Sequence, residues 1–205
     1  MEALDVPAVL EAIARLQVRL NDPMSEPQVA NFEQRHGISL PPDYREFITR
    51  VGNGGDGPFY GVFPLGFMDD NFDMRQWDEN DGFVGTLSKP FSFRDEWNDV
   101  SGMPEDDLLD RDEDAYNKQI EAFNSTYWSS DLIHGAIPIC HEGCALRIWL
   151  VINGEQAGKL WEDRRSEYKG LRPVRLTDGS RATFSGWYKE WLDSSSANSG
   201  QPNCR

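Results

Sequence analysis

The sequence has few of the residues that build disulfide frameworks or nucleophilic active sites. Only 3 of its 205 residues are cysteines, one of them the penultimate residue Cys204, and only 3 are histidines. Three cysteines cannot form a disulfide framework in a chain of this length, which agrees with a reducing compartment. A nucleophile also needs a base and an orienting group beside it, and no local motif supplies them. We therefore expect a protein that is not an enzyme.

Long hydrophobic runs are also missing. No stretch approaches the ~20 consecutive apolar residues of a membrane span. The N-terminus lacks the basic patch, apolar run and small-residue cleavage site of a signal peptide. We therefore expect a cytoplasmic protein that does not bind membranes.

Basic residues are scarce relative to acidic ones. The 20 Lys and Arg residues stand against 35 Asp and Glu, which gives a formal net charge of −15. Nucleic-acid binding depends on Lys and Arg, so this balance disfavours direct binding to DNA or RNA. The acidity is concentrated, because residues 69–114 contain 16 acidic and 4 basic residues, whereas the rest of the chain contains 19 and 16. One segment therefore carries most of the negative charge.

Hydrophobic periodicity predicts three helices near the N-terminus. Residues 5–20 repeat apolar side chains at helical spacing. Ser25 and Gln28 have the pattern of a capping box, which predicts a second helix that starts after Ser25. Gly37 supplies a left-handed stop that ends this helix. Residues 42–52 form a third helix that opens on proline, where a missing amide donor costs nothing.

Strands are predicted after these helices. The glycine-rich run at 52–57 indicates a tight loop, and the aromatic and β-branched residues 59–63 indicate a strand. Residues 137–140, 145–152 and 159–161 are β-prone runs separated by turns, which predicts an antiparallel meander.

The chain ends in a predicted helix and a polar tail. Thr183 is a suitable N-cap for an aromatic-rich helix that extends to about Asp193, and residues 194–205 are small and polar enough to be disordered. No internal repeat is visible. We predict an α+β fold with N-terminal helices packed on an antiparallel or mixed sheet, formed by one domain over residues 1–193 with an acidic insertion at about 67–130.

Two blocks of the sequence resemble the SUKH superfamily, which takes its name partly from a yeast cell-wall-synthesis regulator. The first block consists of residues 40–47 (LPPDYREF), 51–55 (VGNGG) and 61–66 (GVFPLG). The second comprises residues 137–139 (IPI), Gly143, 150–152 (LVI), 158–163 (GKLWED) and the helix that begins at Thr183. The resemblance implies a compact α+β domain without known catalytic residues. Bacterial members of this family are often immunity proteins paired with secreted toxins, many of them nucleases.

One carboxylate group could bind calcium. Four residues match positions 1, 3, 5 and 12 of the calcium-loop pattern: Asp110, Asp112, Asp114 and Glu121. However, Ala115 stands where the loop needs a glycine, and Lys118 stands where an oxygen ligand is expected. The aspartates also suit the N-terminal end of a helix. We therefore expect a helix rather than a calcium site.

A second group gathers softer ligands: Cys140, His141, Glu142 and Cys144. Structural zinc sites usually repeat the cysteine spacing in two pairs, and no second pair exists here. A core or turn role is the simpler reading of these residues. We expect no bound metal and no cofactor.

The acidic segment supplies the candidate partner-binding residues. Its simplest role is that of a solvated insertion that keeps the protein soluble. The resemblance favours a functional role, because a nuclease toxin carries a basic groove that an acidic surface can occupy. The predicted charged contacts are Asp69, Asp70, Asp73, Asp78, Glu79, Asp81, Asp106, Asp107 and Asp110. Trp77 and Trp97 fit equally well as core residues or as recognition hot spots.

The leading hypothesis is therefore a bacterial immunity protein whose partner is a cognate toxin, with a nuclease as the expected toxin. The first alternative is a regulatory scaffold that binds cellular proteins without inhibiting a toxin. The second is a divalent-metal protein built on the carboxylate cluster.

Overall fold

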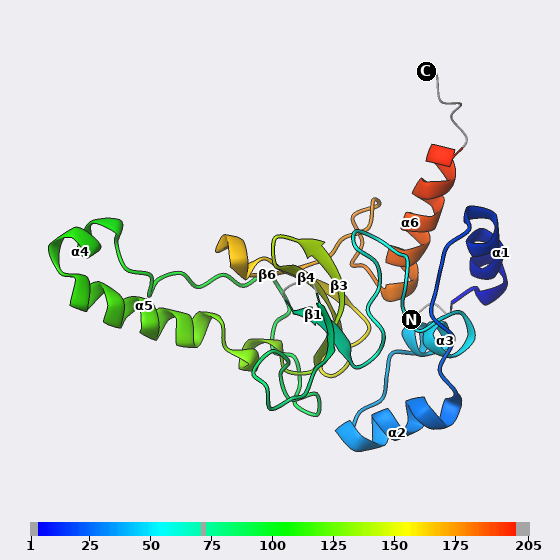
Figure 1. The fold of residues 1–205 in the computed structure, drawn as a ribbon, viewed down its shortest axis with the longest axis horizontal. Helices are drawn as coiled ribbons and strands as arrows, with labels where there is room; N and C mark the ends of the chain where they lie inside the picture. Colours follow the sequence, from blue (N-terminus) through cyan, green and yellow to red (C-terminus); the bar gives the residue numbers. More distant parts are fainter. Residues whose placement is uncertain (1–3, 71–72, 200–205) are drawn as a thin grey trace.

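The structure, a computed structural model, describes residues 4–70 and 73–199 and has the predicted α+β fold (Figure 1). Its helices are α1 (Val6–Leu16), α2 (Glu26–His36), α3 (Pro42–Arg50), α4 (Asp106–Arg111), α5 (Glu113–Tyr127) and α6 (Phe184–Ser199). Its strands are β1 (Phe67–Asp70), β2 (Asp73–Gln76), β3 (Ala136–Gly143), β4 (Leu146–Val151), β5 (Leu160–Asp163) and β6 (Leu171–Pro173). Two short 3-10 helices, η1 (Ser130–Ile133) and η2 (Arg165–Glu167), complete it. None of the described helices is long and apolar enough to cross a membrane.

A four-stranded antiparallel meander in the order β3-β4-β5-β6 forms the centre of the molecule. The predicted meander is thus confirmed, and β6 extends it. Segments without regular structure cover both edges of the sheet. Val62 bridges to Cys140 beside β3, and Trp97 bridges to Leu171 on β6. Covered edges leave fewer free backbone groups for unwanted strand pairing.

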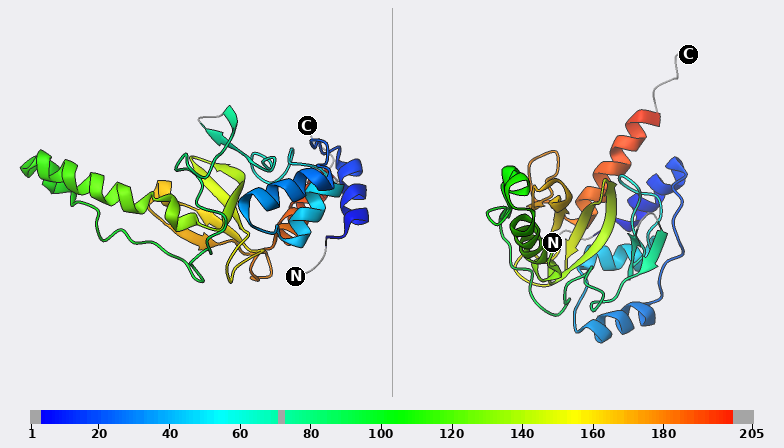
Figure 2. Two further views of the ribbon diagram at one scale, coloured as in Figure 1. Left: turned by 90° about the horizontal axis from the view of Figure 1, so that it is seen from below. Right: turned by 60° about the vertical axis from the view of Figure 1, so that its left-hand side comes forward.

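Helices α1, α3 and α6 lie together at one end of the molecule (Figures 1 and 2). Their core is aromatic, because the ring of Phe47 on α3 packs edge-on against Phe184 and Tyr188 of α6 at 4.9 and 4.8 Å between centroids. Asp43 fixes the start of α6 by accepting a 3.0 Å hydrogen bond from the Ser185 amide. This contact joins two helices that are far apart in sequence.

The glycine-rich loop after α3 brings two backbone segments into close contact. Gly55 has φ +124°, and a Cβ atom there would lie 2.5 Å from the Arg19 carbonyl oxygen. Only glycine fits such an approach. The strand predicted at 59–63 is wrong: these residues form a turn in which Phe59 has φ 54°, and Val62 alone makes isolated bridges.

Helix boundaries follow local capping where it is strong. Helix α2 has the predicted capping box at Ser25 and ends at the left-handed Gly37. Helix α1 is shorter than predicted because Gln17 adopts a left-handed conformation and ends it at Leu16. Helix α6 continues beyond the predicted end at Asp193 to Ser199, and the rest of the predicted tail, residues 200–205, lies outside the described residues.

The segment predicted to be an acidic insertion, residues 67–130, has two parts with different structures. Its first part, the β1–β2 hairpin and the segment after it, packs on the body and buries Val84, Leu87 and Phe91 in the core. Its second part, residues 99–129, projects from the end of the molecule opposite α1 as a helical hairpin of α4 and α5 (Figures 1 and 2). We call this second part the acidic arm.

Candidate partner-binding site

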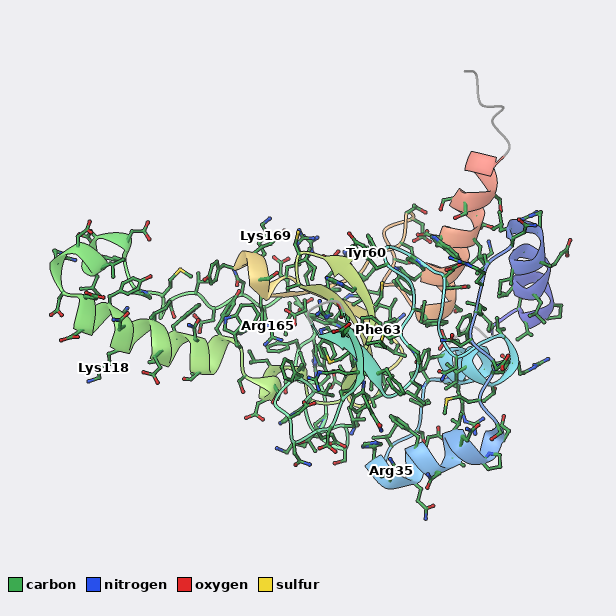
Figure 3. The ribbon with its side chains drawn as sticks, in the orientation of Figure 1. Arg35, Tyr60, Phe63, Lys118, Arg165 and Lys169 are labelled. Carbon is green, nitrogen blue, oxygen red and sulfur yellow. The ribbon has the colours of Figure 1, made fainter. Side chains whose placement is uncertain are left out.

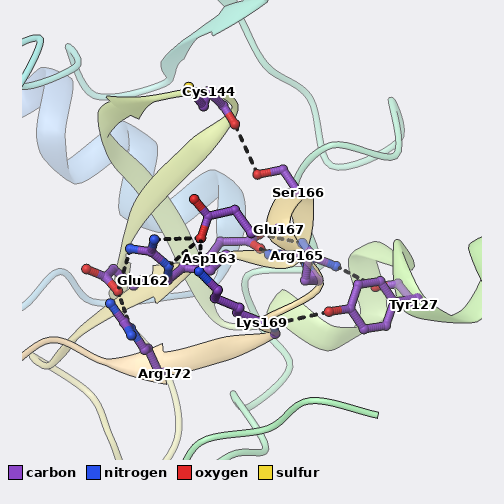
Figure 4. A network of polar contacts seen from close by, with 11 residues as sticks. Tyr127, Cys144, Glu162, Asp163, Arg165, Ser166, Glu167, Lys169 and Arg172 are labelled. Carbon is purple, nitrogen blue, oxygen red and sulfur yellow. Dashed lines mark hydrogen bonds and ion pairs between the residues drawn. The ribbon is translucent and has the colours of Figure 1, made fainter. Parts of the chain in front are cut away.

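The base of the acidic arm is fixed to the sheet by a buried ion pair (Figure 4). The Arg165 guanidinium donates two hydrogen bonds to Asp163, with Nε–Oδ1 and Nη2–Oδ2 distances of 2.9 and 2.6 Å. Its Nη1 donates to the carbonyl oxygens of Tyr127 and Ser129, both at 3.2 Å. These two carbonyls lie at the C-terminal end of α5. One guanidinium therefore satisfies the buried carboxylate and the end of the arm together.

A second set of contacts fixes Tyr127, the last residue of α5. This side chain is buried, and its hydroxyl donates to Asn98 Oδ1 at 2.7 Å and accepts from the Gly170 amide at 3.1 Å. Its ring also packs against Trp97. The arm is thus attached to the body through both of its ends.

The tip of the acidic arm, residues 105–114, is strongly negative. It contains seven acidic residues and one basic residue, Arg111. Asp106 and Asp107 occupy the first turn of α4, and Asp112 caps α5 by accepting a 3.0 Å hydrogen bond from the Ala115 amide. Helix N-termini favour negative charge, which accounts for part of this acidity. Most of these carboxylates are nevertheless exposed, and α4 has no buried residue.

Comparison with protein families matches residues 23–170 to the SMI1 / KNR4 family (SUKH-1). The match covers more than half of the 205 residues. The chain belongs to this family. Comparisons with curated proteins and with solved structures give no significant match.

Within this SUKH-1 domain, the predicted contact residues separate into an exposed and a packed group. Asp73, Asp78, Asp106, Asp107 and Asp110 are exposed, the last three at the tip of the arm. Asp70 lies at the end of β1 beside residues outside the described part of the chain. The five exposed aspartates are therefore accessible to a partner.

Asp69 is a buried structural residue, so the structure does not support it as a contact residue. Its Oδ2 accepts from His141 Nδ1 at 2.7 Å, and Arg147 Nη2 lies 3.1 Å from its Oδ1. Burial lowers the pKa of His141, with a further contribution from Arg147, while the Asp69 carboxylate acts against this shift. The charge of Asp69 therefore fixes β1 against the central sheet.

Two other predicted contacts also hold the insertion on the body. Glu79 pairs with His36 at the end of α2 and accepts a 2.9 Å hydrogen bond from the Leu87 amide. Asp81 pairs with Arg75 at 3.0 Å and accepts a hydrogen bond from the Phe83 amide. Both carboxylates are partly buried, so their first role is to position this segment.

The two tryptophans of the acidic segment pack against the body rather than facing solvent. Trp77 is buried against Phe32 and His36, and Trp97 is partly buried against Phe93 and Tyr127. The structure thus places Trp77 in the core, and Trp97 packs against neighbouring aromatic rings.

Two other aromatic side chains, Trp128 and Tyr168, are exposed near the arm, and no pattern in the sequence pointed to Tyr168. Trp128 at the C-cap of α5 is 42% exposed, and Tyr168 after η2 is 46% exposed. Figure 3 shows that Arg165 and Lys169, which flank Tyr168 in the chain, lie where the arm joins the body. For Trp128, the signal in the sequence was its position a short distance after the acidic segment.

Residues 110–121 and 140–144 contain the two groups of possible metal ligands. Across residues 4–70 and 73–199, no group of three or more His, Cys, Asp or Glu side chains is arranged to hold a metal ion. Asp112 instead caps a helix, Cys140 is buried in the core, and Cys144 lies in the β3–β4 turn with φ 49°.

Glu142, the only carboxylic acid among residues 140–144, has a strongly raised pKa. Burial, and to a smaller extent the nearby Glu162 carboxylate, raise its pKa to about 7, although Arg164 and Arg172 act against this shift. Its Oε2 is buried without a hydrogen-bond partner. Such a carboxyl binds a proton near neutral pH.

Proposed function

We propose that this protein is a cytoplasmic, non-catalytic immunity protein that binds and neutralises a cognate toxin through its acidic arm. The observation that carries this proposal is the tip of the arm, where seven carboxylates and one arginine stand on a helical hairpin that projects from the body. Membership of the SUKH-1 family supports it. The attachment of the base through Arg165 and Tyr127 supports it further, because a preorganised surface loses less entropy on binding.

The charge of the arm indicates the class of toxin. An enzyme that cleaves nucleic acid carries a basic groove for the phosphate backbone. A concentrated negative surface is attracted to such a groove over a long range and competes with the substrate for it. The proposed partner is therefore a nuclease, bound one-to-one.

The first experiment is co-purification with the product of the neighbouring gene, followed by an assay of nucleic-acid cleavage by that product. A stoichiometric complex in which cleavage is lost supports the proposal. A stable complex that leaves cleavage intact would instead favour the second candidate, a regulatory protein-binding scaffold, which the family's yeast relative suggests.

A further inference from the structure

The exposed rings of Trp128 and Tyr168 both lie at the base of the acidic arm, and we call these two residues the aromatic pair. Both rings contact the buried ring of Tyr127, at 5.8 and 6.1 Å between centroids. Because they share this neighbour, both rings lie where the C-terminal end of α5 meets the body. Their partial exposure leaves apolar surface available beside a strongly charged element.

Both members of this pair are held in place by neighbouring residues. The Arg165 guanidinium lies 5.5 Å from the centroid of the Trp128 ring, and the same guanidinium is fixed by Asp163. Tyr168 adopts a left-handed backbone conformation with φ 55°, and its carbonyl accepts a 2.8 Å hydrogen bond from Asn98 Nδ2. Fixed aromatic rings bury large areas on binding at little entropic cost. This is the usual character of an interface hot spot.

The charge around the pair indicates what binds there. Trp128 caps the same helix, α5, whose opposite end carries the acidic tip. A protein that lies along α5 would contact both the aromatic pair and the seven carboxylates of residues 105–114. A cationic protein with an apolar contact surface complements both features.

We infer that Trp128 and Tyr168 anchor the same cationic protein partner that the acidic tip attracts. This inference rests on the proposed function and assigns different roles in binding to the acidic tip and to the aromatic pair. The tip raises the association rate through long-range attraction, and the aromatic pair slows dissociation through buried contact.

The test measures association and dissociation rates of the complex with the neighbouring gene product, using Trp128→Ala and Tyr168→Ala. Each variant is expected to dissociate at least about tenfold faster, with little change in association. Tyr168→Phe keeps the ring and is expected to retain slow dissociation. Tyr60→Ala removes an aromatic side chain that is 77% exposed but lies outside the arm, and it is the matched control. Thermal unfolding of each variant shows whether the fold is intact.

The outcomes separate this inference from the proposed function. If the wild-type complex forms but both alanine variants dissociate at the wild-type rate, the anchor is wrong and the proposed function stands. An equal effect of Tyr60→Ala would also overturn the anchor, because the site would not be specific. If the protein instead forms a dimer of itself that Trp128→Ala disrupts, a second copy occupies the pair. Failure of the wild-type protein to form any complex would contradict both proposals.

Discussion

Arg165 and Asp163 form a buried, two-point ion pair, and the same guanidinium holds the C-terminal end of α5. The pair therefore links the central sheet to the acidic arm. Its side chains are almost completely shielded from water, so loss of either partner leaves an uncompensated buried charge.

Arg165→Met is expected to lower the free energy of unfolding by about 3–5 kcal/mol, because Asp163 and two backbone carbonyls lose their donor. Chemical denaturation measures this change. Arg111→Met is the control, since Arg111 is 62% exposed in its ion pair with Asp107 and exposed pairs contribute little. Equal stability of the two variants would show that the base of the arm is not held by Arg165.

Asp69→Asn is expected to lower the free energy of unfolding by about 1–3 kcal/mol, because Arg147 loses its buried counter-charge. Asp73→Asn changes an exposed aspartate on the neighbouring strand, so its effect on unfolding should be small. The comparison tests whether Asp69 is a structural residue. A wild-type melting temperature for Asp69→Asn would contradict that assignment.

Glu142 should make stability depend on pH. Its pKa is raised to about 7 in the folded protein from an ordinary value of 4.5, so the folded state binds its proton more tightly than the unfolded state does. The resulting stabilisation is fully present below pH 4.5 and is lost as the pH rises through about 7. Glu142→Gln should therefore flatten the melting temperature between pH 5 and pH 8. Glu155→Gln, at an exposed glutamate, should keep the wild-type slope.

The tip of the arm should control how fast the partner binds. Replacement of Asp106, Asp107 and Asp110 by Asn is expected to slow association with the neighbouring gene product by about tenfold at low salt and to weaken its dependence on salt. Stopped-flow measurements over a range of salt concentrations test this. Replacement of Glu11, Asp22 and Glu155 by their amides removes the same charge from the body and should change association much less. Salt-independent association of the wild type would remove the arm from the mechanism.

Local signals in the sequence predicted the elements whose ends depend on short-range chemistry. Ser25, Gln28 and Gly37 define α2, since capping and left-handed stops involve only neighbouring residues. The aromatic spacing after Thr183 likewise predicts α6. Residues 59–63 were predicted wrongly because β-prone side chains there serve a turn. Val62 makes an isolated bridge to β3, and the Tyr60 and Phe63 amides donate hydrogen bonds to β3 carbonyls, but no regular strand forms across these described residues.

The candidate site was only partly predictable. Charge counting located the acidic segment, but its division into a packed part and a projecting arm depends on long-range contacts. Asp69 and Asp73 look alike in sequence, yet Asp69 is buried because His141 and Arg147 come to it from the central sheet. Tyr168 lies far from the acidic segment in the chain, so nothing local connects it with Trp128.

The most direct test of the account is the growth of cells that express the neighbouring gene product with and without this protein. The account predicts that the product alone arrests growth and that co-expression of the wild-type protein restores it. Continued arrest in the presence of the folded, expressed protein would contradict immunity.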